Sequence, residues 1–194
     1  MDNWVDNTVL RLNGIRLEPL GLQHTAGLQT AAADGALWRL RVTSVPEPEN
    51  TAAYIETALH TADRLAFAVI DEASGHVLGS TSYHDILPAV RRLEIGYTWY
   101  AQSHWRTALN STCKLMLLCH AFEALQAQTV GWRTDIENTR SQAAIERLGA
   151  HKDGIIRGNA LRRDGSIRDT VMYSMSRAQW PQAKQALLAR CQCI

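Results

Sequence analysis

Apolar residues along the chain recur at two spacings, one typical of strands and the other of helices. Short apolar or alternating runs bounded by turn signals predict strands over residues 10–20, 65–70, 76–84, 93–100, 129–134, 155–161 and 167–175. Helical spacing predicts helices over residues 21–40, 51–64, 111–126, 139–148 and 181–190. The chain is therefore expected to mix strands and helices in one α/β arrangement.

The middle of the chain predicts two neighbouring parallel strands. Between strands 93–100 and 129–134 lies helix 111–126, which is apolar almost all round and is therefore expected to be buried. A buried crossover helix joins strands that run in the same direction. Within strand 93–100, we expect one face to carry Leu93, Ile95, Tyr97 and Trp99, and the other to carry Glu94, Gly96, Thr98 and Tyr100.

Length and composition indicate a single domain over residues 1–194. Of the 194 residues, 46% are hydrophobic and 20% are charged, and the formal net charge is +1. This near-neutral balance argues against a nucleic-acid-binding protein, which normally carries a basic excess. No stretch approaches the ~18 apolar residues of a membrane span, and the start of the chain lacks the basic and apolar regions of a secretory signal. We therefore expect a cytoplasmic protein without nucleic-acid or membrane partners.

The loop between strand 93–100 and the buried helix is the first candidate site. The N-terminus of a buried helix presents unpaired backbone N–H groups and about half a positive charge, which together bind phosphate. Residues 103–110 reach this helix end, and the guanidinium of Arg106 would add a cation there. The alternative is a plain surface loop, with the helix capped by Asn110 or Ser111.

A second candidate opens the next helix, at Asn138-Thr139-Arg140-Ser141. Asn138 is a natural N-cap. Ser141 shares a helix face with Ile145 and Leu148, at spacings of four and seven residues. Its hydroxyl is therefore expected either to bond back to the first turn or to point at a ligand.

Glu94 is a third candidate, because it opens the strand that leads into the loop. A carboxylate on an interior strand is costly unless it is solvated or paired. A partly buried carboxylate in this position would suit a general base. The alternative is an exposed residue on the polar face of the strand.

Other polar and aromatic residues give weaker signals. His84 and Asp85 are adjacent and would form a hydrogen-bonded pair. Large aromatic residues such as Trp38, Trp99 and Trp132 line a pocket or, more commonly, fill the core. The seven histidines show no metal-ligand spacing, so no metal is predicted. Arg162-Arg163 at the predicted turn after residue 161 is expected to be solvated.

Several motifs follow one another from the middle of the chain to its end. They are Leu93-Glu94-Ile95-Gly96-Tyr97-Thr98-Trp99, Trp105-Arg106-Thr107-Ala108-Leu109-Asn110, Lys114-Leu115, His120-Ala121-Phe122-Glu123, Thr134-Asp135, Asn138-Thr139-Arg140-Ser141, Ala144-Ile145-Glu146-Arg147-Leu148-Gly149-Ala150, Arg168-Asp169-Thr170-Val171-Met172-Tyr173-Ser174 and Trp180-Pro181. With the order of elements, they resemble the GNAT superfamily of acyl-CoA N-acyltransferases, most of all its RimJ/RimL-type branch of ribosomal-protein N-terminal acetyltransferases. The resemblance implies a mixed, mostly antiparallel twisted sheet with helices on both faces. A central parallel strand pair would splay to hold acetyl-CoA.

The resemblance also implies roles for individual residues. Backbone N–H groups of the loop would bind the pyrophosphate of coenzyme A, here at Arg106, Thr107, Ala108, Leu109 and Asn110. The family's usual pattern has glycines where Arg106 and Ala108 stand. Asn138 would contact the cofactor, Ser141 would protonate the leaving thiolate, and Glu94 would act as the base, often through water. The remaining site residues are Tyr97, Thr98 and Trp99, expected to supply a strand amide to the thioester oxygen, and Trp38, Tyr83, His84 and Trp132, expected to line the substrate pocket.

The function implied by this resemblance is transfer of an acetyl group from acetyl-CoA to a primary amine by direct attack, without a metal. Similarity to the branch suggests a protein N-terminal α-amine as the acceptor. Three alternatives stay open: an acetyltransferase of small amines or antibiotics, an acyl-CoA-binding sensor without catalysis, and a plain interaction module. A monomer and a homodimer are both compatible with the sequence.

Overall fold

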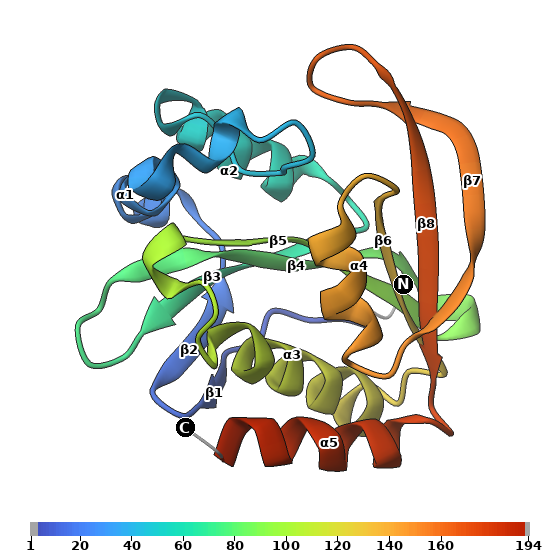
Figure 1. Ribbon diagram of the computed structural model, residues 1–194. Coiled ribbons are helices and arrows are strands. Elements are labelled where there is room, and N and C mark those ends of the chain that lie inside the picture. The colour runs from blue at the N-terminus through green and yellow to red at the C-terminus, as the bar shows by residue number, and fades with distance from the viewer. Residues whose placement is uncertain (1–3, 193–194) are drawn as a thin grey trace.

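A single eight-stranded sheet forms the centre of the computed structural model, which describes residues 4–192 (Figure 1). Residues 1–3 and 193–194, the two ends of the domain expected over 1–194, lie outside the described range. The strands are β1 (Leu10–Leu12), β2 (Ile15–Pro19), β3 (Leu65–Asp71), β4 (Val77–Leu87), β5 (Arg92–Tyr100), β6 (Thr129–Asp135), β7 (His151–Leu161) and β8 (Ile167–Ser176). Their order across the sheet is β1-β2-β3-β4-β5-β6-β8-β7.

Helices cover both faces of the sheet (Figure 1). They are α1 (Thr25–Ala33), α2 (Thr51–His60), α3 (Leu109–Cys119), α4 (Thr139–Glu146) and α5 (Trp180–Gln192). Helices α1 and α2 pack on one face, over a core that includes Leu28, Ile55 and Trp99. Helices α3 and α5 pack on the other face, over a larger core that includes Leu93 and Leu117. Within residues 4–192, none of the helices has the length and apolar character needed to cross a membrane.

The predicted helix over residues 21–40 is too long. Helix α1 ends at Ala33, and a 3-10 segment, Asp34–Arg39, follows it. Gly35 and Ala36 have φ values of +80° and +50°, which no right-handed helix accommodates. The apolar spacing of this stretch therefore continues past the point where the backbone turns.

Strands β5 and β6 are the one parallel pair among the described strands, and helix α3 makes the crossover between them. This confirms the predicted parallel pair, and the predicted fold class with it. The pairing is short, because it joins only residues 92–94 of β5 to residues 129–131 of β6. Beyond Glu94, no described strand pairs with β5 on its β6 side.

A β-bulge in β5 changes which side chains face each way. On β4, Ser80 and Ser82 pair with Trp99 and Gly96, so β5 contains one extra residue between these pairs. Tyr97 lies in this bulge with φ of +49° and is 42% exposed. The predicted alternation is therefore wrong beyond Gly96: Trp99 joins the core under α1 and α2, whereas Tyr100 joins the core under α3.

Candidate active site

Glu94 is a buried member of an ion-pair cluster at the point where β5 and β6 separate. Its carboxylate is 2% exposed, so the alternative of a solvated residue on a polar strand face is wrong. Arg92 donates from Nη2 to Oε1 at 3.1 Å, and Arg133 of β6 donates from Nε to Oε2 at 2.7 Å. Both carboxylate oxygens therefore accept from guanidinium groups, which compensates for the cost of burial.

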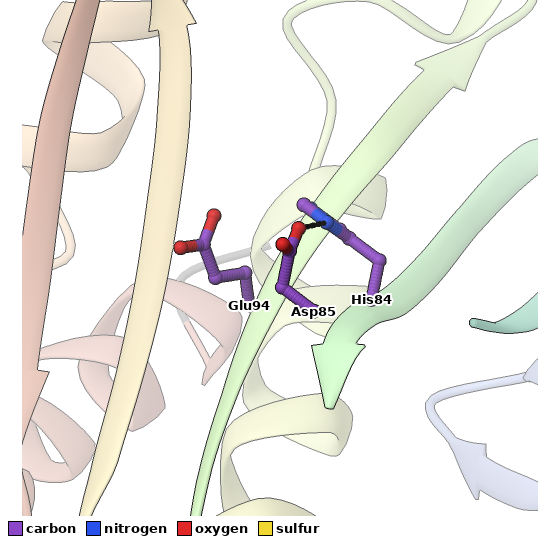
Figure 2. Close-up of side chains that lie close together, drawn as sticks. All are labelled: His84, Asp85 and Glu94. Carbon is purple, nitrogen blue, oxygen red and sulfur yellow. Dashed lines mark hydrogen bonds and ion pairs between the residues drawn. The ribbon is translucent and has the colours of Figure 1, made fainter. Parts of the chain in front are cut away.

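His84 and Asp85, at the end of β4, form the other half of this cluster (Figure 2). The Nδ1 of His84 lies 2.6 Å from Oδ2 of Asp85, which confirms the predicted pair. Asp85 also accepts from Nη2 of Arg133 at 2.9 Å. Asp85 has φ of +46°, and the pairing of β4 with β5 is interrupted between His84 and Leu87. This unusual backbone conformation turns the carboxylate back toward the imidazole of the preceding residue.

Burial and charge act in opposite directions on the imidazole. Desolvation lowers the pKa of His84 below its usual 6.5, and the charge of Arg133 lowers it further, whereas Asp85 and Glu94 oppose the shift. The net direction is downward, which favours the neutral imidazole near neutral pH. Because Nδ1 donates to a carboxylate, the proton of the neutral ring stays on Nδ1 and the lone pair on Nε2.

The cluster brings together three side chains that are common metal ligands. One ligand atom each of His84, Asp85 and Glu94 lies within 4.8 Å of the others. However, Arg92 and Arg133 are ion-paired with the two carboxylates and neutralise their charge. We therefore assign these residues to an ion-pair network and place no metal here.

Under the second half of β5 lies a buried lysine of α3. Lys114 is 6% exposed, and its Nζ donates to Oγ1 of Thr98 at 2.8 Å. Thr98 in turn lies 2.8 Å from the hydroxyl of Thr81 on β4. Burial lowers the pKa of Lys114 from 10.5 to about 8. This chain of polar groups holds β5 immediately after the bulge, where β6 no longer supports it.

The loop from β5 to α3 leaves the N-terminus of the helix open. The N-cap residue is Ala108, which has no side-chain oxygen, so neither Asn110 nor Ser111 is the cap. The hydroxyl of Thr107 accepts from the N–H of Leu109 at 3.3 Å, which is a weak contact. Arg106 has φ of +61°. Arg106 thus adopts the left-handed conformation that favours glycine. It stands at one of the two positions where the family that the sequence resembles usually has glycine.

Two arginines lie near this open helix end. The guanidinium of Arg140, from the first turn of α4, stacks 3.7 Å from the ring centre of Trp105. Partial burial lowers the pKa of Arg140, and the charge of Arg106 lowers it further. Neither arginine forms an ion pair with a carboxylate within residues 4–192. Arg140 was not predicted as a site residue, although it stands between two residues that were.

The start of α4, in contrast, is closed by its own side chain. Oδ1 of Asn138 accepts from the N–H of Ser141 at 3.0 Å, which confirms the predicted cap. Its amide group donates to the carbonyl of Val42 at 3.2 Å. The Ser141 hydroxyl is half-buried and has no hydrogen-bond partner in the described part of the chain, so of the two predicted alternatives it does not bond back to the turn.

Two residues predicted for the substrate pocket belong to the core instead. Tyr83 is fully buried on the α3 face, where its hydroxyl donates to the carbonyl of Leu117. Trp132 of β6 is 2% exposed in the same core. Both predictions are wrong because adjacent strand residues point to opposite faces of the sheet: the next residues along, His84 and Arg133, face the ion-pair cluster, whereas Tyr83 and Trp132 face the core. Trp38 is half-buried in the segment Asp34–Arg39, and its role in a pocket stays a prediction.

Comparison with known proteins identifies the family. Residues 15–151 match the acetyltransferase (GNAT) domain. A solved structure of a "putative acetyltransferase" from T. thermophilus is 34% identical, with a TM-score of 0.85 over 96% of this chain and 98% of that one. The structure of Mycobacterium smegmatis RimJ in complex with CoA-disulfide has the same fold, with 22% identity and a TM-score of 0.76 over 94% of this chain and 93% of that one.

A curated relative extends the comparison. The Bacillus subtilis protein named "Putative ribosomal N-acetyltransferase YdaF" is 29% identical over 110 residues, which are 57% of this chain and 59% of that protein. The aligned part thus spans less than two thirds of this relative. The chain belongs to the GNAT acetyltransferase family, which confirms the resemblance inferred from its motifs.

Proposed function

We propose that this protein transfers the acetyl group of acetyl-CoA to a primary amine and releases free coenzyme A. The single observation that carries the proposal is the course of β5. This strand separates from β6 after Glu94 and leads, through a bulge and a short loop, to the uncapped N-terminus of a buried helix. Membership of the GNAT family supports the same conclusion.

The cofactor's phosphates are proposed to bind at the N-terminus of α3. Free N–H groups in residues 106–110 and the dipole of the helix favour an anion there. Arg106 and Arg140 add two positive charges that no described carboxylate neutralises. Arg140 in this role is inferred from the structure, whereas Arg106, Thr107, Ala108, Leu109 and Asn110 follow the sequence-based prediction. The CoA-disulfide bound to RimJ of M. smegmatis supports a coenzyme A site on this fold.

The thioester is proposed to lie along the open side of β5. Backbone groups of Tyr97, Thr98 and Trp99 have no strand partner on that side within residues 4–192, so they are available to the pantetheine and to the thioester oxygen. The Trp99 side chain itself is in the core, so only its backbone takes part. A backbone N–H aimed at the developing oxyanion would lower the barrier to attack.

Three residue roles stay predictions from the sequence. Ser141 is proposed to protonate the departing thiolate, and its unpartnered hydroxyl supports this role. Asn138 is proposed to contact the cofactor. Its side-chain amide already forms hydrogen bonds with the backbone of Ser141 and Val42. Glu94 as the base would act while each of its carboxylate oxygens also accepts a hydrogen bond from Arg92 or Arg133.

A protein N-terminal α-amine is the proposed acceptor, because the curated relative YdaF is named as a ribosomal N-acetyltransferase. A neutral α-amine is accessible near pH 7–8, since its usual pKa is about 7.7–8.0. The alternative acceptor is a small amine. The two are distinguished by presenting the same amine on peptides and on free small molecules.

The experiment that tests the function measures release of free thiol from acetyl-CoA in the presence of a panel of peptides and small amines. We expect thiol release that depends on both substrates and a mass increase of one acetyl group on the amine. Binding of acetyl-CoA without thiol release from any amine would favour the sensor alternative. Absence of both binding and release would favour an interaction module.

A further inference from the structure

One basic atom in the cluster where β5 and β6 separate has no hydrogen-bond partner in the described part of the chain. The Nε2 of His84 has no hydrogen-bond partner within residues 4–192, and it is not among the fully enclosed polar atoms that lack partners. It lies against Gly96, where an added Cβ would come within 2.3 Å of it. Gly96 is the residue immediately before the bulge at Tyr97, so Nε2 faces the stretch of β5 where the thioester is proposed to lie.

The neighbouring carboxylates are already ion-paired with guanidinium groups. Glu94 is held by Arg92 and Arg133, and Asp85 by Arg133 and His84 itself. Tyr97 packs edge-on against the His84 ring with centroids 5.1 Å apart, and the guanidinium of Arg64 lies 3.8 Å from the centre of the Tyr97 ring. Both carboxylates of the cluster thus contact a cation, whereas within residues 4–192 no cation pairs with Nε2 of His84.

The geometry points to His84, oriented by Asp85, as the catalytic residue that accepts the proton of the attacking amine. This inference rests on the proposed acetyl transfer and replaces Glu94 in the role of the base. Glu94 is then a positioning residue, whose carboxylate holds Arg133 against Asp85 and thereby keeps Asp85 on Nδ1 of the imidazole.

The step balances without any further reactant. The lone pair of the neutral amine forms a bond to the thioester carbon, and the amine nitrogen gives one proton to Nε2 of His84. The carbon–sulfur bond then breaks, with its electron pair leaving on sulfur. The thiolate takes up a proton directly from the imidazolium, or from Ser141 or water, which the imidazolium then reprotonates. Amine and acetyl-CoA thus give the amide and coenzyme A, and His84 is neutral again.

Two local backbone features serve this arrangement. The positive φ of Asp85 is unusual for a residue other than glycine, and it allows residue 85 to reach back to residue 84. The absence of a Cβ at Gly96 leaves room for the imidazole edge. A plain ion-pair network would require neither feature, because Glu94 and Arg133 pair without them.

The test compares His84→Gln, His84→Ala and Asp85→Asn with the wild type, together with Glu94→Gln. We expect the turnover number of His84→Gln to fall about 100- to 10,000-fold, while calorimetry gives an acetyl-CoA affinity within twofold of the wild type. Added imidazole should restore part of the turnover of His84→Ala and none of that of Glu94→Gln. Unchanged turnover in His84→Gln, or full activity in Asp85→Asn together with no rescue of His84→Ala, would overturn the assignment.

A second readout does not depend on activity. Nitrogen-15 NMR of the histidine side chains in the wild-type protein should show His84 neutral at pH 7, with the proton on Nδ1. Loss of that proton position in Asp85→Asn is expected. A cationic ring, or a proton on Nε2, contradicts the inference. Because this measurement needs no amine substrate, it separates failure of the inference from failure of the proposed acetyl transfer.

Discussion

The two ends of strand β5 differ sharply in their surroundings. Residues Arg92–Glu94 have strand partners on both sides and lie in a cluster where every carboxylate is paired. In the second half of the strand, Trp99 and Tyr100 pair only with β4, Tyr97 and Thr98 form the bulge, and Lys114 donates a hydrogen bond to Thr98. The closed end, residues 92–94, fixes charged groups in place. The open end, residues 97–100, leaves backbone groups free to bind a ligand. One strand thus supplies both the proposed chemistry and the proposed cofactor contacts.

The largest effect is expected where the two ends meet, at Gly96. In Gly96→Ala, the new Cβ would lie 2.3 Å from Nε2 of His84 and displace the ring that Asp85 holds. We expect turnover to fall about 100-fold or more with little change in acetyl-CoA affinity. Gly21→Ala is a matched control, because its Cβ meets only the flexible end of Gln23. Normal turnover in Gly96→Ala would show that the ring position has no part in the reaction.

At the closed end, Glu94→Gln removes the charge that pairs with Arg92 and Arg133. We expect turnover to fall about 10- to 100-fold and acetyl-CoA affinity to change much less, because the cofactor's phosphates bind at the other end. Steady-state kinetics and calorimetry measure the two quantities separately. Equal turnover at saturating substrate across the pH range contradicts a role of Glu94 in the reaction, both as base and as positioning residue.

The buried Lys114, which contacts the open end of β5, predicts a pH dependence of the free energy of unfolding. The pKa of Lys114 is about 8 in the folded protein and 10.5 by default, so between these values the unfolded chain binds more protons. Lys114 should therefore contribute a rise in the free energy of unfolding with pH in this range, of up to about 1.4 kcal/mol per pH unit. Measured by urea unfolding, the wild type and the exposed control Lys152→Met should gain stability relative to Lys114→Met as the pH rises. Parallel curves for all three proteins contradict the assignment.

The sequence predicted the closed end better than the open end. An apolar helix between two strands is a local pattern, and it correctly predicted the parallel pair joined by α3. The bulge at Tyr97 depends on the register with β4, which no alternation within residues 93–100 reveals. One of the two partners of Glu94 is Arg133, which lies 39 residues away in the sequence. Likewise Arg162, expected to be solvated, pairs with Asp135 and has a side chain only 6% exposed.

The smallest effect is expected at the end of the loop that follows the open half of β5. Arg106→Ala should weaken binding of coenzyme A about tenfold, which corresponds to one charge-assisted hydrogen bond. Arg140→Ala should act similarly, and turnover at saturating acetyl-CoA should stay near that of the wild type. Arg11→Ala, which removes an ion pair with Glu72 on the far edge of the sheet, is the matched control. Calorimetry giving the same affinity for all four proteins would mean that neither arginine contacts phosphate.

The central claim is that the open side of β5 holds the thioester arm of acetyl-CoA. The most direct measurement is a crystal structure of the protein with acetyl-CoA bound. We predict the pyrophosphate at residues 106–110, the pantetheine beside Tyr97–Trp99, and the acetyl group next to Gly96 and His84. Coenzyme A bound elsewhere on the protein, or a helix α3 N-terminus that remains free of phosphate in the complex, would contradict the account.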